Sequence, residues 1–177
     1  MSVSLNFEWI IKGKSGTFLL ISTKKQVFPV KIELDMMDGK ILEILQADAR
    51  VTMAEIGRRI HLSQPAVTER VKRMEAANVI TGYHARVNPE ALGYGITAFV
   101  RIASRATDTP VLKIAEQVPE VVECHAITGE DCVIVKVVAP SVRELERVIT
   151  SLARCGVTST SLILSSSIER RAIKPVE

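Results

Sequence analysis

The chain has 177 residues, enough for one large domain or two small ones at about 150 residues per domain. Hydrophobic residues make up 47% and charged residues 24%, which is too apolar for a disordered chain. No apolar run approaches the roughly 18 residues of a membrane span, and the run 18–21 is too short for a signal peptide. Three cysteines, an odd number, argue against a disulfide framework, so we expect a cytoplasmic globular protein.

The net charge of +3 comes entirely from the first 33 residues, which carry five lysines against Glu8 and Glu33. Residues 34–83 carry seven basic and seven acidic side chains, and residues 84–177 carry eleven of each. A nucleic-acid site must therefore depend on a local patch rather than on global basicity.

The leader, residues 1–33, is the least patterned part of the chain. Segments 7–11 and 17–22 flank Gly13-Lys14-Ser15-Gly16, so a β-hairpin is possible, and a lysine-rich tether is the alternative. Gly13-Lys14-Ser15 is not a phosphate-binding loop, because position 8, where that motif needs glycine, is Glu.

Residues 34–80 predict three helices. Asp35 with Asp38 forms an acidic variant of the capping box at the first, and Thr52 with Glu55 forms the T-x-x-E box at the second. Ser63 caps the third, where a proline in the first turn is tolerated. Apolar residues at spacings of three and four follow each cap: Leu34, Met37, Ile41, Leu42 and Leu45, then Ile56 and Ile60, then Val67, Val71 and Met74.

The second and third helices are separated only by residues 61–63, which predicts a helix-turn-helix whose last helix is free to enter a DNA major groove. Gln and Thr suit base edges, whereas Lys and Arg suit guanine or phosphate. Any surface helix shows such residues, so the pattern alone does not decide for DNA. Arg70 is open between DNA contact and pairing with Asp48 or Glu55. The candidate DNA-binding residues are Arg58, Arg59, Ser63, Gln64, Pro65, Thr68, Glu69, Arg70, Lys72 and Arg73.

From about residue 95 the hydrophobic period changes to that of strands. Short β-branched runs at 96–102, 121–127, 132–138 and 161–168 alternate with helical spacing at 109–117 and 141–153. The order βαββαβ is ferredoxin-like, so the fold class is α+β. We expect a leader (1–33), a helix-turn-helix domain (34–83), a linker (84–94), a ferredoxin-like domain (95–170) and a tail (171–177).

The sequence gives little support for metal binding or catalysis. Cys124, His125 and Cys132 could suggest a metal, but neighbouring strand residues point to opposite faces, which favours a buried thiol. No Ser–His–Asp or Cys–His arrangement with an orienting third group is present in the sequence. We therefore expect a protein that is not an enzyme, with no catalytic residues, no metal and no cofactor.

Several motifs occur in register: Leu34-Asp35-x-x-Asp38, Ala54-Glu55-Ile56, Leu62-Ser63-x-Pro65-Ala66-Val67 and Val79-Ile80-Thr81-Gly82-Tyr83. Together they resemble the Lrp/AsnC, or feast/famine, family of transcription regulators. The resemblance implies a winged-type DNA-binding domain followed by an effector-binding, oligomerising αβ domain. It further implies double-stranded DNA and an amino acid or related small molecule as partners, homodimers that assemble further, and no membrane. Family members begin a few residues before the first helix, so the leader is either an appendage or a misread start.

Two positions depart from the family pattern. His61 replaces the usual glycine before Leu62-Ser63, and we favour a helix C-cap over a phosphate contact there. After Thr128-Gly129 the family has any residue, an aromatic and Asp, whereas this chain has Glu130, Asp131 and Cys132. This departure weakens the prediction that the loop 129–132 binds the effector. It favours the polar stretch 156–161 as the effector site, although that stretch can also be interpreted as a plain edge strand. The candidate effector-binding residues are Gly129, Glu130, Asp131, Cys132, Thr158, Ser159, Thr160 and Ser161.

The sequence thus predicts a sequence-specific, ligand-responsive DNA-binding transcription regulator. The alternative is a nucleoid-associated architectural protein with low sequence preference, and a third reading is an amino-acid sensor that acts through protein partners. Helices of one chain cover one face of a four-stranded sheet, so we expect the other face to pack against a second chain. Lysine at Val135 or Val137 is the substitution this pattern suggests for testing that interface.

Overall fold

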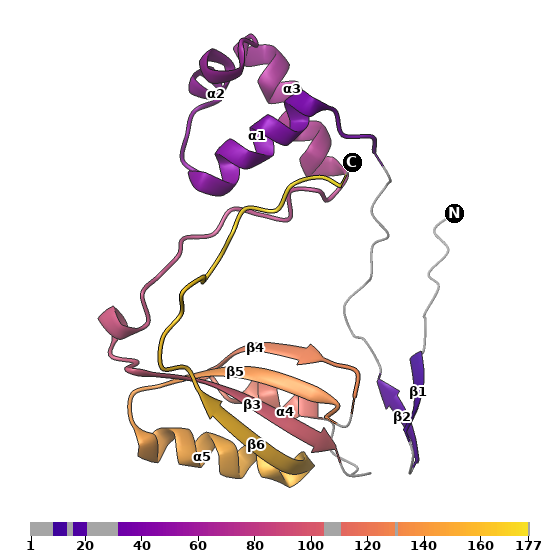
Figure 1. Cartoon of the computed structure of the whole chain (residues 1–177), viewed down its shortest axis with the longest axis vertical. Coiled ribbons are helices and arrows are strands. Elements are labelled where there is room, and N and C mark those ends of the chain that lie inside the picture. Colours follow the sequence, from indigo (N-terminus) through magenta and orange to yellow (C-terminus); the bar gives the residue numbers. More distant parts are fainter. Residues whose placement is uncertain (1–8, 14–15, 21–31, 105–110, 130, 177) are drawn as a thin grey trace. The chain divides into compact units, whose positions relative to one another are not determined.

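The structure, a computed structural model, describes residues 9–13, 16–20, 32–104, 111–129 and 131–176 (Figure 1). Its contacts divide the chain into two compact units. The helical unit comprises residues 25–86 and 167–177, and the sheet unit comprises residues 1–24 and 87–166. Within the described ranges, no helix has the length and apolar character needed to cross a membrane.

The helical unit contains the three expected helices: α1 (Met36–Ala47), α2 (Met53–Ile60) and α3 (Gln64–Ala76). Each presents its predicted apolar stripe to one shared core, so burial of aliphatic side chains holds the three together. The fully or almost fully buried members are Ile41, Leu45, Ile56, Ile60, Val67, Val71 and Met74.

The helix caps follow the sequence in α1 and only in part in α2. Asp35 Oδ1 accepts from the Asp38 N–H at 2.9 Å, and Asp38 Oδ2 accepts from the Asp35 N–H at 3.0 Å, so the acidic capping box is complete. Thr52 Oγ1 accepts from the Glu55 N–H at 3.1 Å, but the Glu55 carboxylate is bound by two arginines of α2 instead of closing the box. A complete second box was therefore a wrong expectation.

No wing follows α3. Residues 77–89, all of them described, contain turns and no strand before the short 3-10 helix η1 (Glu90–Leu92). This differs from the winged-type domain that the resemblance implied. The three-helix core does not need a wing, because its apolar surface is covered by Val79 and Ile80, which pack against it directly after α3.

The sheet unit has the expected βαββαβ order. Four antiparallel strands lie in the spatial order β4-β5-β3-β6, so β5 and β3 are the two inner strands, and the two expected helices pack on one face. The elements are β3 (Ile96–Ser104), α4 (Val111–Gln117), β4 (Val121–Ala126), β5 (Val133–Ala139), α5 (Val142–Leu152), the 3-10 helix η2 (Ala153–Cys155) and β6 (Gly156–Leu162).

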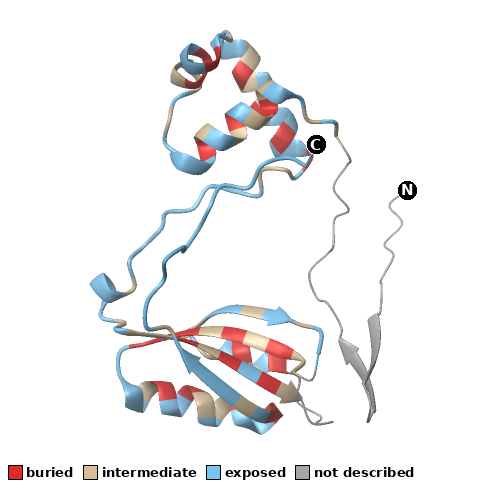
Figure 2. Ribbon diagram, viewed as in Figure 1, coloured by how far each residue is buried: buried red, intermediate tan, exposed pale blue. Residues whose placement is uncertain are grey.

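The two faces of this sheet differ sharply in burial (Figure 2). Val100, Val135 and Val137 are fully buried on the face that the helices cover, whereas Phe99 and Ile134 lie on the open face and are half-buried. The choice of Val135 and Val137 for probing an interface was therefore wrong, since lysine there would disrupt the core. The open face is the side available to a second chain.

The last strand starts earlier than expected. β6 pairs with β3 from Gly156, opposite Ser104, to Leu162, opposite Ala98, so the stretch 156–161 is an edge strand and not a loop. The apolar residues that suggested 161–168 mostly lie outside it, and Leu164 is 92% exposed. An edge strand tolerates serine and threonine because half of its surface stays in water, which hid it from a search for apolar runs.

Part of the leader forms a hairpin. β1 (Trp9–Gly13) pairs antiparallel with β2 (Gly16–Leu20), with Trp9 opposite Leu20 and Gly13 opposite Gly16. This agrees with the hairpin alternative. Lys14 and Ser15 of the Gly-Lys-Ser sequence lie outside the described residues.

Candidate nucleic-acid interface and ligand site

Two residues shape the turn between α2 and α3: one adopts a left-handed backbone conformation, and the other lies where the backbone leaves no room for a side chain. His61 ends α2 in the left-handed conformation (φ 58°, ψ 42°), as expected for the C-cap role. The Leu62 N–H then donates to the Gly57 carbonyl at 2.9 Å. A Cβ on Gly57 would lie 2.4 Å from the Leu62 carbonyl oxygen, so only glycine lets the chain turn this closely. Gly57 was not among the residues predicted from the sequence, although a glycine inside a short helix was a signal.

The outer side of α3 carries the polar residues expected to meet DNA. Val67, Val71 and Met74 are buried, so the helix has a distinct solvent face. Ser63 Oγ accepts from the Ala66 N–H at 3.4 Å, which makes it the N-cap, and Thr68 Oγ1 donates to the Gln64 carbonyl at 2.9 Å. The exposed members of this face are Gln64, Pro65, Glu69, Lys72 and Arg73, with Thr68 half-buried.

Arg58 and Arg59 lie in the last turns of α2 and share one partner. Both guanidinium groups bind the Glu55 carboxylate, Arg59 through Nε at 2.8 Å. The hydrogen bond from Arg59 lowers the pKa of Glu55 below its usual value. The arginine side chains are 78% and 52% exposed, so their remaining N–H groups face solvent. This arrangement leaves both cations accessible to a phosphate.

Arg70 and Arg73 differ from Arg58 and Arg59, because they bind carboxylates at the start of α1. Arg70 Nη1 lies 2.6 Å from Asp35 Oδ2 and 2.9 Å from Asp38 Oδ1, and Arg73 Nη2 lies 2.5 Å from Asp38 Oδ2. The Asp38 side chain is fully buried. Hydrogen bonds to Asp35 and Asp38 raise the pKa of Arg70, and the pKa of Asp35 is lowered mainly by the Asp38 N–H and then by Arg70. Asp48 and Glu55 were the wrong partners for Arg70.

In the sheet unit, the structure brings two of the candidate effector stretches together. Arg101, on the open face of β3, donates from Nη2 to Ser159 Oγ at 3.3 Å. Its Nε lies 3.8 Å from Asp131 Oδ2. Arg101 was not predicted from the sequence, because an isolated arginine in a strand gives no pattern. The strand register reveals its partners.

The remaining candidate effector residues are placed less uniformly. Ser159 and Ser161 share the open face with Arg101, whereas Thr158 and Thr160 lie on the opposite face, since alternate residues of a strand point to alternate sides. The loop before β5 is closed by the Cys132 N–H, which donates to Ile102 O at 2.9 Å. Gly129 has φ +123°, a conformation that suits glycine. Glu130 lies outside the described residues.

Cys124 and His125 lie on opposite faces of β4. His125 and Glu123 lie on the open face, where the Glu123 carboxylate meets Lys136 Nζ at 3.1 Å and His125 Nε2 at 3.5 Å. The bond to Lys136 is the main reason that the pKa of Glu123 is lowered. Burial raises the pKa of the Cys124 thiol. Within the described part of the chain, no three His, Cys, Asp or Glu residues are arranged to hold a metal ion.

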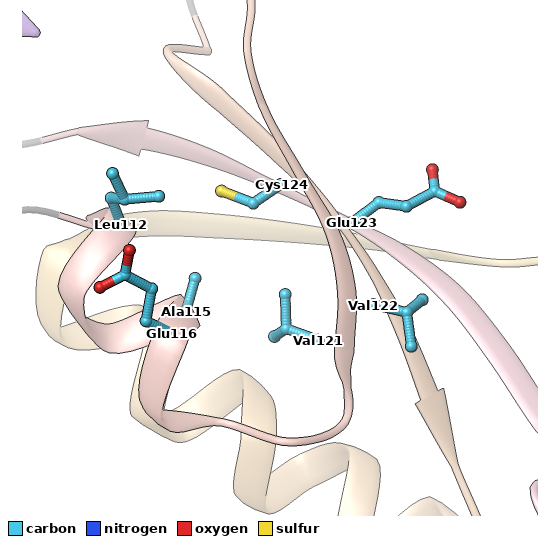
Figure 3. A pocket seen from close by; sticks show the side chains of 7 residues that line it. All are labelled: Leu112, Ala115, Glu116, Val121, Val122, Glu123 and Cys124. Carbon is cyan, nitrogen blue, oxygen red and sulfur yellow. The ribbon is translucent and has the colours of Figure 1, made fainter. Parts of the chain in front are cut away.

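A shallow hollow between α4 and β4 lies on the helix-covered side (Figure 3). The Cys124 thiol points toward α4, whereas the Glu123 carboxylate points away from it. None of the candidate effector residues lines this hollow, so it is separate from the Arg101 cluster. Its lining residues are Leu112, Ala115, Glu116, Val121, Val122, Glu123 and Cys124.

Comparisons with known proteins give both units a family. Residues 34–75 match the AsnC-type helix-turn-helix domain, and residues 97–173 match the Lrp/AsnC ligand binding domain. The uncharacterized HTH-type transcriptional regulator YezC of Bacillus subtilis is 38% identical over 134 residues, which are 76% of this chain and 96% of YezC.

Two solved structures share the fold and contain an amino acid. The feast or famine regulatory protein Rv3291c of M. tuberculosis, complexed with L-methionine, is 33% identical, with a TM-score of 0.75 over 81% of this chain and 100% of that one. The transcriptional regulator NMB0573 of Neisseria meningitidis, also in an L-Met complex, is 26% identical, with a TM-score of 0.73 over 80% of this chain and 96% of that one. Sequence, fold and paired domains therefore agree: this chain belongs to the Lrp/AsnC family of ligand-responsive, helix-turn-helix transcriptional regulators.

Proposed function

We propose that the chain is a sequence-specific regulator that reads double-stranded DNA through α3, in the cytoplasm, and performs no catalysis. The observation that carries the proposal is the two-sided character of α3. Its apolar side is buried against α1 and α2, while Gln64 and Lys72 stand exposed directly after a tight turn. A helix presented in this way has the form that enters a major groove, with its first turns nearest the base edges.

We propose three different roles for the charged and polar residues of this surface. Gln64 and Thr68, in the first turns of α3, are proposed to read bases, with Ser63, Pro65 and Glu69 beside them. Arg58, Arg59 and Lys72 are proposed to bind phosphates. Arg70 and Arg73 are proposed to act indirectly, because their guanidinium groups are bound to Asp35 and Asp38 and hold α3 in place.

A selection from random DNA followed by titration of the selected site tests these roles. Alanine at Gln64 or Thr68 should cost about 1–3 kcal/mol on the selected site and relax preference at one base position. Alanine at Lys72 should weaken binding to all DNA sequences alike. It should also lower, by about 1, the slope of the logarithm of the binding constant against the logarithm of salt concentration. Lys40→Ala, on the exposed side of α1, is the matched control. Equal binding of selected and random fragments at physiological salt would instead indicate an architectural protein.

For the small molecule, we propose an amino acid bound at Arg101. A guanidinium binds a carboxylate in two parallel hydrogen bonds, and a carboxylate such as Asp131 can accept from an ammonium group. Ser159 adds a hydroxyl on the same face. The cluster is thus complementary to both charged ends of an amino acid, the class of ligand present in the two L-methionine complexes of related regulators.

A thermal-shift screen of the twenty amino acids, beginning with L-methionine, tests the site. A ligand at 100 times its Kd should stabilise the protein by about 2.7 kcal/mol. Arg101→Met should remove that shift, whereas Arg143→Met, on the exposed surface of α5, should keep it. No shift with any amino acid would refute this ligand class, and a shift that persists in Arg101→Met would refute the role of Arg101.

We also propose that the open face of the sheet is a dimer interface from which higher oligomers assemble. Phe99 and Ile134 lie there as partly exposed apolar side chains, and no helix of the sheet unit covers them in the described residues. These two apolar side chains are better covered than left in water, and a second copy of the same chain supplies that cover with two-fold symmetry.

A further inference from the structure

The C-terminal segment contacts the helical unit, although it leaves from the end of the sheet unit. Directly beyond β6, the Ile163 N–H donates to Thr97 O at 2.9 Å. Residues 167–177 then belong to the helical unit. The chain therefore joins β6 to the helical unit by a second path, in addition to residues 77–95.

The main attachment is a paired hydrogen bond between a side chain and the backbone. Gln46 Nε2 donates to Ile173 O at 2.9 Å, and Gln46 Oε1 accepts from the Ile173 N–H at 2.9 Å. Gln46 Nε2 also lies 3.2 Å from Leu42 O, within α1 itself, which orients the amide. A glutamine amide that meets both backbone groups of one residue imitates the pairing of two strands and recognises an extended segment.

Neighbouring residues on α1 extend the attachment. Lys174 Nζ lies 3.5 Å from Glu43 Oε1, and Gly39 leaves its surface open where Pro175 lies. Positions 39, 43 and 46 follow the spacing of one helix face, opposite the buried Ile41 and Leu45. The segment thus runs along the outer face of α1 toward its N-terminus.

The same segment is also fixed to the chain that follows α3. Arg86 and Glu169 form an ion pair within the helical unit. Together with the Gln46–Ile173 pair, it attaches the segment at two points. None of these residues is among those assigned to base or phosphate contact, so the segment has an independent role.

We propose that residues 167–176 are a strap that docks on α1 and gives the DNA-binding unit a second attachment to the chain, beyond β6. A unit held by two connections loses less freedom when it binds DNA than a unit held by one. Docking therefore raises DNA affinity without touching DNA. The proposal rests on the DNA-binding function only for this last step, because docking itself is measured separately.

Trypsin measures docking directly, because Arg170 and Arg171 lie three and two residues before Ile173. Cleavage after Arg171 requires the following residues to leave α1. Gln46→Ala should speed release of residues 172–177 by roughly tenfold, a factor typical of losing one or two net hydrogen bonds. Alanine is a better helix former than glutamine, so faster cleavage would not reflect a weakened helix. Gln117→Ala, on α4, is the matched control and should release the segment at the wild-type rate.

DNA affinity is then measured on a mixed-sequence duplex at low salt. Gln46→Ala should bind roughly threefold more weakly, as should a chain that ends after Arg171. Because both changes remove the same attachment, Gln46→Ala in the shortened chain should add nothing further. If Gln46→Ala proves unstable, the shortened chain tests the effect of the same attachment on DNA affinity.

Each outcome decides one part of the proposal. Wild-type release rates in Gln46→Ala would overturn docking. Faster release with unchanged DNA affinity would overturn the effect of the second attachment on DNA binding while leaving the segment docked. Failure of the wild-type chain to bind any DNA would overturn that effect together with the proposed function, whereas the trypsin result would still stand.

Discussion

Replacing Asp38 with alanine should destabilise the helical unit by about 3 kcal/mol. The carboxylate is fully buried and accepts the Asp35 N–H at 3.0 Å and two arginines at 2.9 and 2.5 Å. Breaking a buried ion pair costs about 3–5 kcal/mol because the partner charge is left unpaired. Arg70 and Arg73 are 27% and 47% exposed, so water can rehydrate them, which places the cost at the lower end of that range.

Asp38→Asn should cost less, about 2 kcal/mol. The amide keeps one acceptor oxygen of nearly the same shape, but it carries no charge, and a hydrogen bond to a charged group is worth about 1.5–3 kcal/mol. Asp48→Asn is the matched control, since Asp48 is an exposed carboxylate at the other end of α1 and, among the described residues, its side chain accepts only the Arg50 N–H. We expect the control to stay within about 0.5 kcal/mol of wild type.

Urea unfolding followed by helical circular dichroism measures the effect on the whole chain. At about 1.5 kcal/mol/M, a loss of 3 kcal/mol moves the midpoint of the helical unit by about 2 M. Hydrogen exchange of α1 and α3 amides assigns the transition to this unit rather than to the sheet. A midpoint within about 0.3 M of wild type in Asp38→Ala would refute the network as a source of stability. Arg70→Ala with unchanged stability and weakened DNA binding would show that this arginine faces DNA instead.

Three further outcomes follow from particular contacts. Gly57→Ala should cost about 1–3 kcal/mol, since the new Cβ would lie 2.4 Å from Leu62 O; a wild-type melting temperature would show that the turn can open. Lysine at both Phe99 and Ile134 should yield monomers in light scattering, whereas a persisting dimer would exclude the sheet face. The pKa of Glu123 is lowered from 4.5 in the folded chain, so its contribution to stability is complete above about pH 4.5 and is lost as the pH falls through the lowered value. Lys136→Met should make the unfolding midpoint less dependent on pH in this acid range. An unchanged pH profile would exclude the Glu123–Lys136 ion pair as the cause of the loss.

The helices and the central strands could be predicted because their signals are local. Asp35, Thr52 and Ser63 mark helix starts through their own side chains, and the apolar stripe from Val67 to Met74 marks the buried face of α3. In each case a few neighbouring residues carry all the information, since caps and helical periodicity depend only on short spacings.

The partners of charged residues could not be predicted, because they depend on contacts distant in the sequence. Arg70 meets Asp35 and Asp38, which lie 35 and 32 positions away, and the nearer candidates Asp48 and Glu55 are engaged elsewhere. The early start of β6 was hidden for a related reason. An edge strand is defined by pairing with β3, which serine and threonine permit without any apolar pattern.

The edge position of β6 separates folding stability from the proposed ligand recognition in the sheet unit. Ser159 and Ser161 are exposed and contribute nothing to the buried core, which is made by residues of β3, β5, α4 and α5 together with Cys155. Surface substitutions at such positions usually change folding stability by less than about 0.5 kcal/mol. At this proposed ligand site, gene duplicates can therefore exchange the two serines and change ligand preference while the fold remains intact. Diversification of the ligand would be concentrated at this edge of the sheet, whereas the buried side chains Ala98, Val100 and Ile102 of β3 would accept little change.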